Sequence, residues 1–118
     1  MSDQKIVAGK TTIAPEVLQT IALLTTLNTP GVSQMAPAPA HFARLFKRGV
    51  QEGVLIDVQD DAVFADLYII LKKDVNIRDI SRQIQREVAR AISEMVGMQV
   101  GRVNIHVEDI DYSTETEA

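Results

Sequence analysis

The stretch from residue 76 to residue 110 constrains the fold more than any other part of the chain. Its first part, NIRDISRQIQREVARAISEMVG, has apolar residues at every third or fourth position and ends in glycine. This spacing predicts one amphipathic helix, with Asn76 as its N-cap and Gly97 as its stop. The alternating sequence that follows predicts a strand over 103–110. The side chains expected to face inward from the helix are Ile77, Ile80, Ile84, Val88, Ala91, Ile92 and Met95.

A predicted pair of strands precedes this helix. The segments 54–58 and 63–71 are rich in β-branched residues, and an Asp-Asp pair lies between them. A two-residue turn at that pair places Val58 opposite Val63. The long helix spans roughly 30 Å, enough to recross a strand of this length. We therefore expect strand 103–110 to run parallel to strand 63–71, through a right-handed crossover.

The first part of the chain predicts three short elements. Three β-branched residues indicate a brief strand over 9–13, and Pro15 suits the first position of a helix over 15–27. A Pro-Gly turn then leads to a second short strand over 32–35. We expect the inner face of this helix to consist of Val17, Leu18, Ile21 and Leu24.

These elements define the predicted fold class, α/β (α+β). We expect a two-layer sandwich in which a mixed β-sheet carries two main helices on one face, in the order βαβ(α)ββαβ. The bracketed helix is the basic and aromatic segment HFARLFKR at 41–48. The domain is expected to cover 9–112, with a disordered N-terminus over 1–8 and an acidic, disordered tail over 113–118.

Composition excludes several classes of function. The chain of 118 residues contains no cysteine, which rules out disulfides and thiol chemistry. No apolar run approaches the roughly 18 residues of a membrane span, and the N-terminus lacks the apolar region of a secretory signal. The net charge of −4 argues against general attraction to nucleic acid or anionic lipid. The sequence therefore predicts a cytoplasmic protein.

Candidate chemistry is sparse. The sequence carries no phosphate-binding loop, dinucleotide fingerprint or nucleophile elbow. Asp57, Asp66, Glu108 and His106 project from the predicted sheet and resemble a loose metal or acid/base constellation. One histidine and scattered acids on separate strands are, however, the ordinary composition of a solvated sheet face. We expect no enzyme activity, no cofactor and no metal.

Two surfaces are candidates for interaction. Four arginines step by four along the back of the long helix, and they could dock an acidic protein, an RNA backbone or lipid headgroups. The alternative is an ordinary solvated helix face. The second candidate is the half-apolar outer face of the two central strands. The residues of the two surfaces are Arg78, Arg82, Arg86, Arg90, Leu55, Phe64, Tyr68 and Ile70.

The motifs GKTTIAPEV, NTPGV, GVLIDV, DLYIIL, NIRDISRQIQREV and VGRVNIHV resemble the bacterial alkaline shock protein family, also called envelope stress response proteins. The likeness covers 9–112. It departs from the family at Ala14, where members usually have a capping serine, and over 36–48, which matches nothing in the family. The resemblance implies a small cytosolic protein without known catalytic activity that serves cell-envelope stress or homeostasis.

The resemblance also implies self-association, since this is common in the family, and some members sit at the inner face of the membrane through an anchored partner. We therefore expect a non-enzymatic interaction or scaffold protein that forms homo-oligomers and docks to a membrane-anchored protein. The alternative hypothesis is an anion-binding or RNA-binding module that uses the four arginines, although the net charge disfavours nucleic acid.

Overall fold

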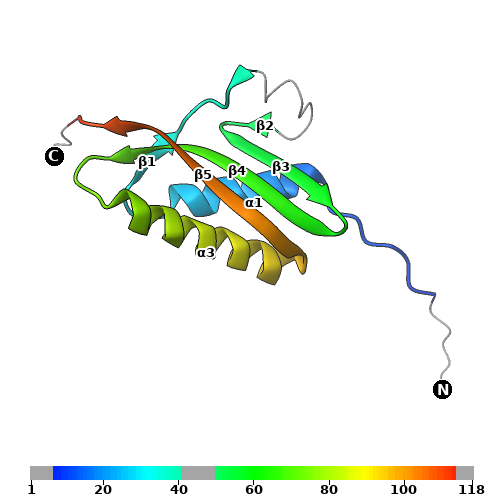
Figure 1. The fold of residues 1–118 in the computed structure, drawn as a ribbon. Helices are drawn as coiled ribbons and strands as arrows, with labels where there is room; N and C mark the ends of the chain where they lie inside the picture. Colours follow the sequence, from blue (N-terminus) through cyan, green and yellow to red (C-terminus); the bar gives the residue numbers. More distant parts are fainter. Residues whose placement is uncertain (1–6, 41–49, 114–118) are drawn as a thin grey trace.

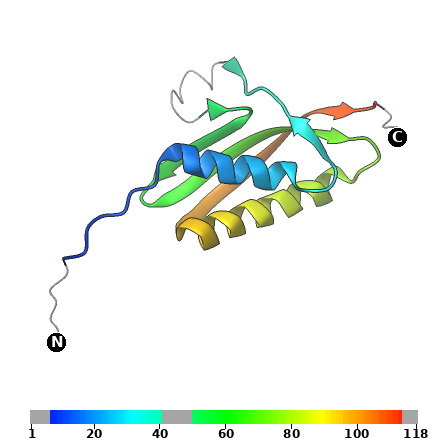
Figure 2. The same cartoon turned by 180° about the vertical axis from the view of Figure 1, so that it is seen from behind.

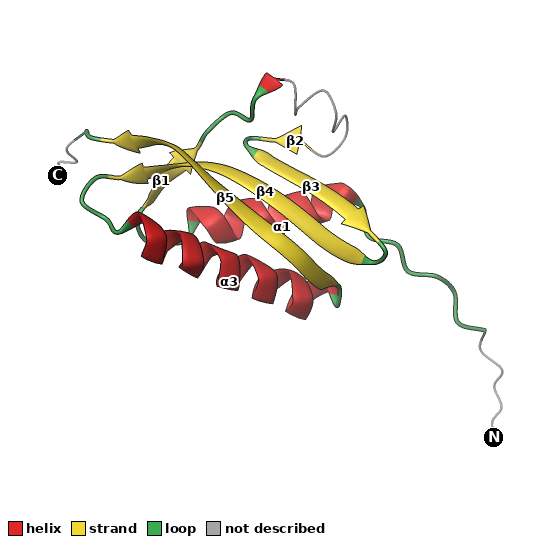
Figure 3. Cartoon of the chain, in the orientation of Figure 1, coloured by secondary structure: helices red, strands yellow, loops and turns green. Residues whose placement is uncertain are grey.

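The computed structural model of the protein describes residues 7–40 and 50–113, and it confirms the predicted two-layer class (Figure 1). Helices α1 (Pro15–Leu27) and α3 (Ile77–Val96) pack on one face of a five-stranded mixed sheet (Figures 2 and 3). The strands are β1 (Val32–Met35), β2 (Val50–Gln51), β3 (Val54–Gln59), β4 (Ala62–Lys72) and β5 (Gln99–Asp111). Neither of the two described helices is both long and apolar enough to cross a membrane.

Strand β4 organises the sheet. Strand β5 pairs with it in parallel along its whole length, as predicted from the length of α3. On its other edge β4 pairs antiparallel with β3 through its first half and with β1 through its last residues. The short strand β2 extends the sheet beyond β3. The main core lies between this sheet and the two helices.

The predicted hairpin between β3 and β4 is confirmed residue by residue, because Val58 lies opposite Val63. Its two turn residues, Asp60 and Asp61, have φ values of 52° and 64°. A two-residue type I′ turn requires positive φ at both central positions, and aspartate tolerates this better than most residues. The strand pairing thus forms this turn although neither turn position is glycine.

Helix α3 follows its prediction closely. The Asn76 side chain accepts a hydrogen bond of 2.9 Å from the backbone N–H of Asp79, and Gly97 ends the helix at φ 74°. Ile84, Val88 and Ile92 are fully buried. Two expected inward residues are exposed instead: Ile77 and Met95, at 46% and 70%. Both lie in the terminal turns of the helix, where less of the sheet and of α1 covers them.

The predicted strand over 9–13 is wrong, since these residues belong to no described strand. High β-propensity forms a strand only where a neighbouring strand supplies hydrogen bonds. The order of described elements is therefore αββββαβ, without the first predicted strand and with the additional strand β2. The predicted helix at 41–48 and most of both predicted disordered termini lie outside the described residues.

Helix α1 has the predicted bounds, but its inner face was only half correctly predicted: Leu18 is buried and Ile21 packs against the core, whereas the other two residues face outward. Val17 and Leu24 are 45% and 54% exposed. Apolar residues occur on several sides of this helix, so its sequence pattern cannot specify its rotation. Its contacts with α3, β1 and β3 do. The residues that it buries are Leu18, Gln19, Ala22, Leu23 and Thr26.

A polar contact near the C-terminus joins the end of β5 to β1. The Asp111 carboxylate accepts hydrogen bonds from the backbone N–H and hydroxyl of Ser113, at 2.9 and 2.7 Å, and from the Ser33 hydroxyl at 2.7 Å. The bonds from Ser113 and then from Ser33 lower the pKa of Asp111 to about 2, and Lys72 acts in the same direction. The folded state thus favours the ionised carboxylate.

We expect this contact to make stability pH-dependent. A carboxylate with a lowered pKa contributes stability that is complete above its unfolded pKa, ordinarily 3.8, and is lost as the pH falls through about 2. Denaturant unfolding of the wild type and of Asp111→Asn between pH 7 and pH 2 tests this. The wild type should be more stable at neutral pH, and the difference should shrink toward pH 2. A difference that stays constant over this range would contradict the prediction.

Candidate interaction surfaces

The four arginines predicted to share one face of the long helix do so. Arg78, Arg82, Arg86 and Arg90 lie on α3, away from its buried stripe, and all are exposed. We call them the arginine ridge. Arg90 makes an ion pair of 3.3 Å with Glu94, in which both side chains are 67% exposed. With partners taken from residues 7–40 and 50–113, the other three make no ion pair.

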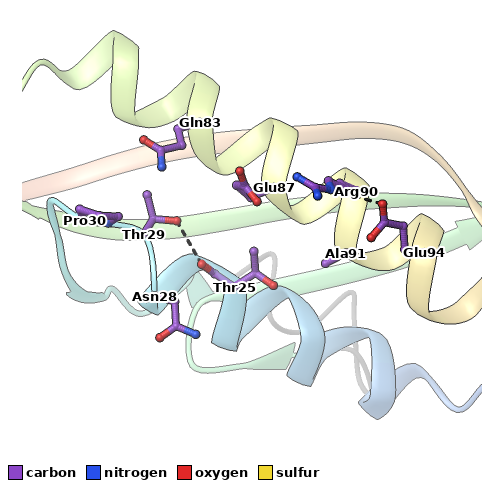
Figure 4. A pocket seen from close by; sticks show the side chains of 9 residues that line it. All are labelled: Thr25, Asn28, Thr29, Pro30, Gln83, Glu87, Arg90, Ala91 and Glu94. Carbon is purple, nitrogen blue, oxygen red and sulfur yellow. Dashed lines mark hydrogen bonds and ion pairs between the residues drawn. The ribbon is translucent and has the colours of Figure 1, made fainter.

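One end of the ridge borders a pocket between the two helices. This pocket has a volume of about 390 Å³ and opens between the C-terminal end of α1 and the part of α3 from Gln83 to Glu94 (Figure 4). Arg90 lines it together with Glu87 and Glu94, so two carboxylates lie close to that guanidinium. The free positive charge of the ridge is therefore concentrated on Arg78, Arg82 and Arg86.

The outer face of the sheet was predicted as an open, half-apolar surface, and this is only partly true. Leu55 and Tyr68 are each 2% exposed, so neither is available to a partner in this conformation. They form a small second cluster with Ala36, against which Ala38 and Ile70 pack. The segment 36–39 contains two prolines, which break regular structure, and nothing in its sequence indicated that it covers the sheet.

The remaining predicted residue of this face is Phe64, which is half-buried. Its ring occupies the space above Gly101 on the neighbouring strand, where an added Cβ would come within 2.5–2.6 Å of two ring carbons. Phe64 and Ile70 thus present only part of their surfaces. The four predicted apolar residues therefore do not form an exposed patch.

A polar cluster lies beside Tyr68 on the same face. One oxygen of Asp66 accepts a hydrogen bond of 3.0 Å from the Asn104 amide and lies 2.9 Å from Nε2 of His106. The His106 ring stacks on Tyr68, with ring centroids 4.3 Å apart and planes within 10°. Burial raises the pKa of Tyr68, and the negative charges of Asp66 and Glu108 act in the same direction. These contacts hold the parallel strands β4 and β5 in register.

The structure does not assemble the loose constellation considered from the sequence. Asp66 and His106 meet, but Asp57 instead accepts a hydrogen bond of 2.7 Å from Gln59 on its own strand. Over residues 7–40 and 50–113, no group of three or more histidine, cysteine, aspartate or glutamate side chains is placed to hold a metal ion. The contact between the Asp66 carboxylate and His106 orients the imidazole ring against Tyr68.

The fold and these surfaces define a small two-layer α/β domain with an exposed row of cations on its longer helix. A family model described by a cell envelope-related function matches residues 3–112. The chain belongs to this family, the alkaline shock protein 23 family. The family resemblance read from the sequence motifs is thereby confirmed.

Relatives in two bacteria agree with this assignment. The uncharacterized protein YqhY of Bacillus subtilis (strain 168) is 28% identical over 111 residues, which cover 92% of this chain and 82% of that protein. The uncharacterized protein Spy1535 of Streptococcus pyogenes serotype M6 is 33% identical over 104 residues, or 86% of this chain and 79% of that protein.

A solved structure shares the fold. The zinc form of a MamM CTD variant superposes with a TM-score of 0.51 at 11% sequence identity, over 82% of this chain and 87% of that chain. At this identity the similarity concerns the arrangement of helices and strands alone.

Proposed function

We propose that this protein is a non-enzymatic interaction protein of cell-envelope homeostasis. In this proposal it self-associates and is held at the inner face of the membrane by an anchored protein partner. Membership of a family with a cell envelope-related function supports the setting. The arginine ridge supports the mode of docking.

The observation that carries the docking proposal is the isolation of three arginines on an acidic protein. Arg78, Arg82 and Arg86 are exposed and make no ion pair with any described residue, while the whole chain has a net charge of −4. Guanidinium groups bind carboxylates through paired, charge-assisted hydrogen bonds. The ridge therefore fits an acidic segment of the anchored partner, and it presents its charges to that partner along one rigid helix.

Charge reversal on the ridge tests this proposal. Arg82→Glu with Arg86→Glu should weaken recovery of the partner about tenfold or more in a pull-down from native membranes, since reversing two exposed charges costs on the order of 1–2 kcal/mol. Arg102→Glu with Lys10→Glu is the matched control, because both residues are exposed and lie off the ridge. Each double variant reverses two positive charges, which changes the net charge from −4 to −8.

The outcomes separate three possibilities. If both double variants recover the partner as well as the wild type does, the ridge is an ordinary solvated face. If the wild type recovers no membrane protein, the docking proposal fails. In a third outcome, ribonuclease removes the captured material, and binding weakens steeply between about 50 and 200 mM salt. This outcome favours the alternative, an RNA-binding or other anion-binding module that uses the same ridge.

A further inference from the structure

Helix α1 exposes apolar side chains at the spacing of a helix-packing seam. Val17, Leu24 and Leu27 are 45%, 54% and 41% exposed, and Thr20, also exposed, lies between them. The intervals of three, four and three residues are those of the contact positions in paired helices. Seen from the helical side of the molecule, α1 has no described segment in front of it (Figure 2). We call these four residues the α1 seam.

The rotation of α1 makes this exposure significant. The helix buries two polar side chains, Gln19 and Thr26, at 2% and 0% exposure, while it exposes two leucines. Inside the core, the Thr26 hydroxyl is satisfied by a 2.7 Å hydrogen bond to the carbonyl of Ala22. Leu18 and Leu23 already fill the core side of the helix, so Leu24 and Leu27 are apolar side chains that its own core does not use.

Thr20, the one polar member of the seam, can be buried in an interface without losing a hydrogen bond. The Thr20 hydroxyl donates a hydrogen bond of 2.9 Å to the backbone carbonyl of Glu16 in its own helix. It therefore leaves no unpaired donor when water is removed. Covering this surface costs little, because the side chains around it are aliphatic.

We propose that the α1 seam binds the same seam of a second copy of this chain, with the two helices antiparallel across a two-fold axis. This inference rests on the self-association in the proposed function and names its surface. With the axis between Thr20 and Ile21, Val17 of each copy faces Leu24 of the other, and Ala14 faces Leu27. Every pairing then joins apolar or small residues.

The charge distribution favours this occupant. Glu16 is the only charged residue of α1, so a two-fold contact, which sets each residue against the same surface of its partner, opposes few like charges. A membrane-surface helix would carry lysine or arginine beside its apolar face, and α1 has neither. A charged partner would find its complement on the arginine ridge instead. The antiparallel arrangement also aligns the helix dipoles favourably.

The length of the seam bounds the affinity. The 13 residues of α1 make a helix about 20 Å long, which is short for an interface; stable interfaces usually bury about 800 Å² per partner. We therefore expect a dimer with a dissociation constant on the order of micromolar or weaker.

Sedimentation of the full chain from low micromolar to several hundred micromolar tests the proposal. The wild type should pass from monomer to dimer over this range, and Leu24→Glu should raise the dissociation constant at least tenfold. Met95→Glu is the matched control, since Met95 is 70% exposed on the other helix and the substitution likewise replaces an apolar side chain with glutamate. Circular dichroism confirms that each variant is folded.

Disulfide trapping tests the geometry independently, because the chain contains no cysteine of its own. An equimolar mixture of Val17→Cys and Leu24→Cys chains should cross-link through a disulfide at least several-fold more than either variant alone. Preferential cross-linking of Leu24→Cys with itself, or no cross-linking, overturns the antiparallel seam.

The results also distinguish the surface from the function. If Leu24→Glu dimerises like the wild type, the seam is wrong but self-association stands. If the wild type is monomeric at every concentration, both the seam and the self-association proposed above are overturned. This holds even if Leu24→Glu weakens the binding of a different protein, because the seam would then bind that protein and not a second copy. Docking through the ridge is judged separately, by the pull-down of the Arg82 and Arg86 variant.

Discussion

Replacing Gly53 with alanine is expected to destabilise the protein by about 3 kcal/mol or more, as for other steric and backbone violations in a core. Gly53 has φ +84°, and a Cβ there would collide with the carbonyl oxygen of Ala36 and come within 2.9 Å of that of Tyr68. Both obstacles are backbone atoms, so neither can move without breaking sheet pairing. Denaturant unfolding of the variant measures the loss.

The position of Gly53 explains why the effect is large. The Tyr68 N–H donates to the Gly53 carbonyl at 2.9 Å, and the Ala36 N–H donates to the Tyr68 carbonyl at 2.8 Å. Gly53 and Ala36 therefore meet side by side at the point where β4 changes partners from β3 to β1. The same junction carries the segment that covers Leu55 and Tyr68, so Gly53→Ala should also open the outer face.

Gly97→Ala is the matched control for this prediction. Gly97 also has positive φ, at +74°, but nothing lies within 4 Å of an added Cβ. Alanine there meets only the backbone strain, which costs about 1–2 kcal/mol. If the two glycine variants lose equal stability, the close approach of backbone atoms is not the main reason that Gly53 is required.

The second large effect is expected from Ile84→Ala, which should cost about 2–5 kcal/mol of unfolding free energy. Ile84 is 0% exposed and lies in the middle turns of α3, between the sheet and α1. Truncation removes buried apolar surface and leaves a cavity that rigid neighbours on β4 cannot fill. Urea unfolding measures this loss directly, provided that the variant and the wild type show the same dependence of unfolding free energy on urea concentration.

Ile77→Ala provides the comparison on the same helix. Ile77 carries the same side chain and belongs to the same predicted stripe, but it is 46% exposed in the first turn. We expect its truncation to cost about 1 kcal/mol or less, because most surface mutations stay small. Equal losses at Ile77 and Ile84 would show that the stripe is buried along its whole length, contrary to the structure.

The arginine ridge shows which part of a surface can be predicted from sequence. A step of four residues on an amphipathic helix places side chains on one face whatever the tertiary contacts are. The same local spacing allows the pair between Arg90 and Glu94, which lie four residues apart. What could not be predicted is that Arg90 faces a pocket formed with α1. That pocket exists only because the two helices pack against each other.

The outer sheet face shows the opposite case. Strand alternation correctly placed Leu55, Tyr68 and Ile70 on one side of the sheet, away from the main core. It could not show that Ala36 and Ala38 fold over them, because this cover comes from a segment that is distant in sequence and has no periodicity. The α1 seam was missed for a related reason: two of its four residues, Val17 and Leu24, were expected inside, but both are exposed.

The sequence by itself determined the parts of this protein in which local pattern and chain geometry leave one solution. These are α3 with its Asn76 and Gly97 ends, the register of the β3–β4 hairpin, and the parallel direction of β5. The tertiary structure alone decided the rotation of α1, the cover over Tyr68 and the absence of strand pairing over 9–13 with any described residue. A helix with apolar residues on several sides and a strand-prone segment each have several acceptable local states, and only long-range contacts select among them.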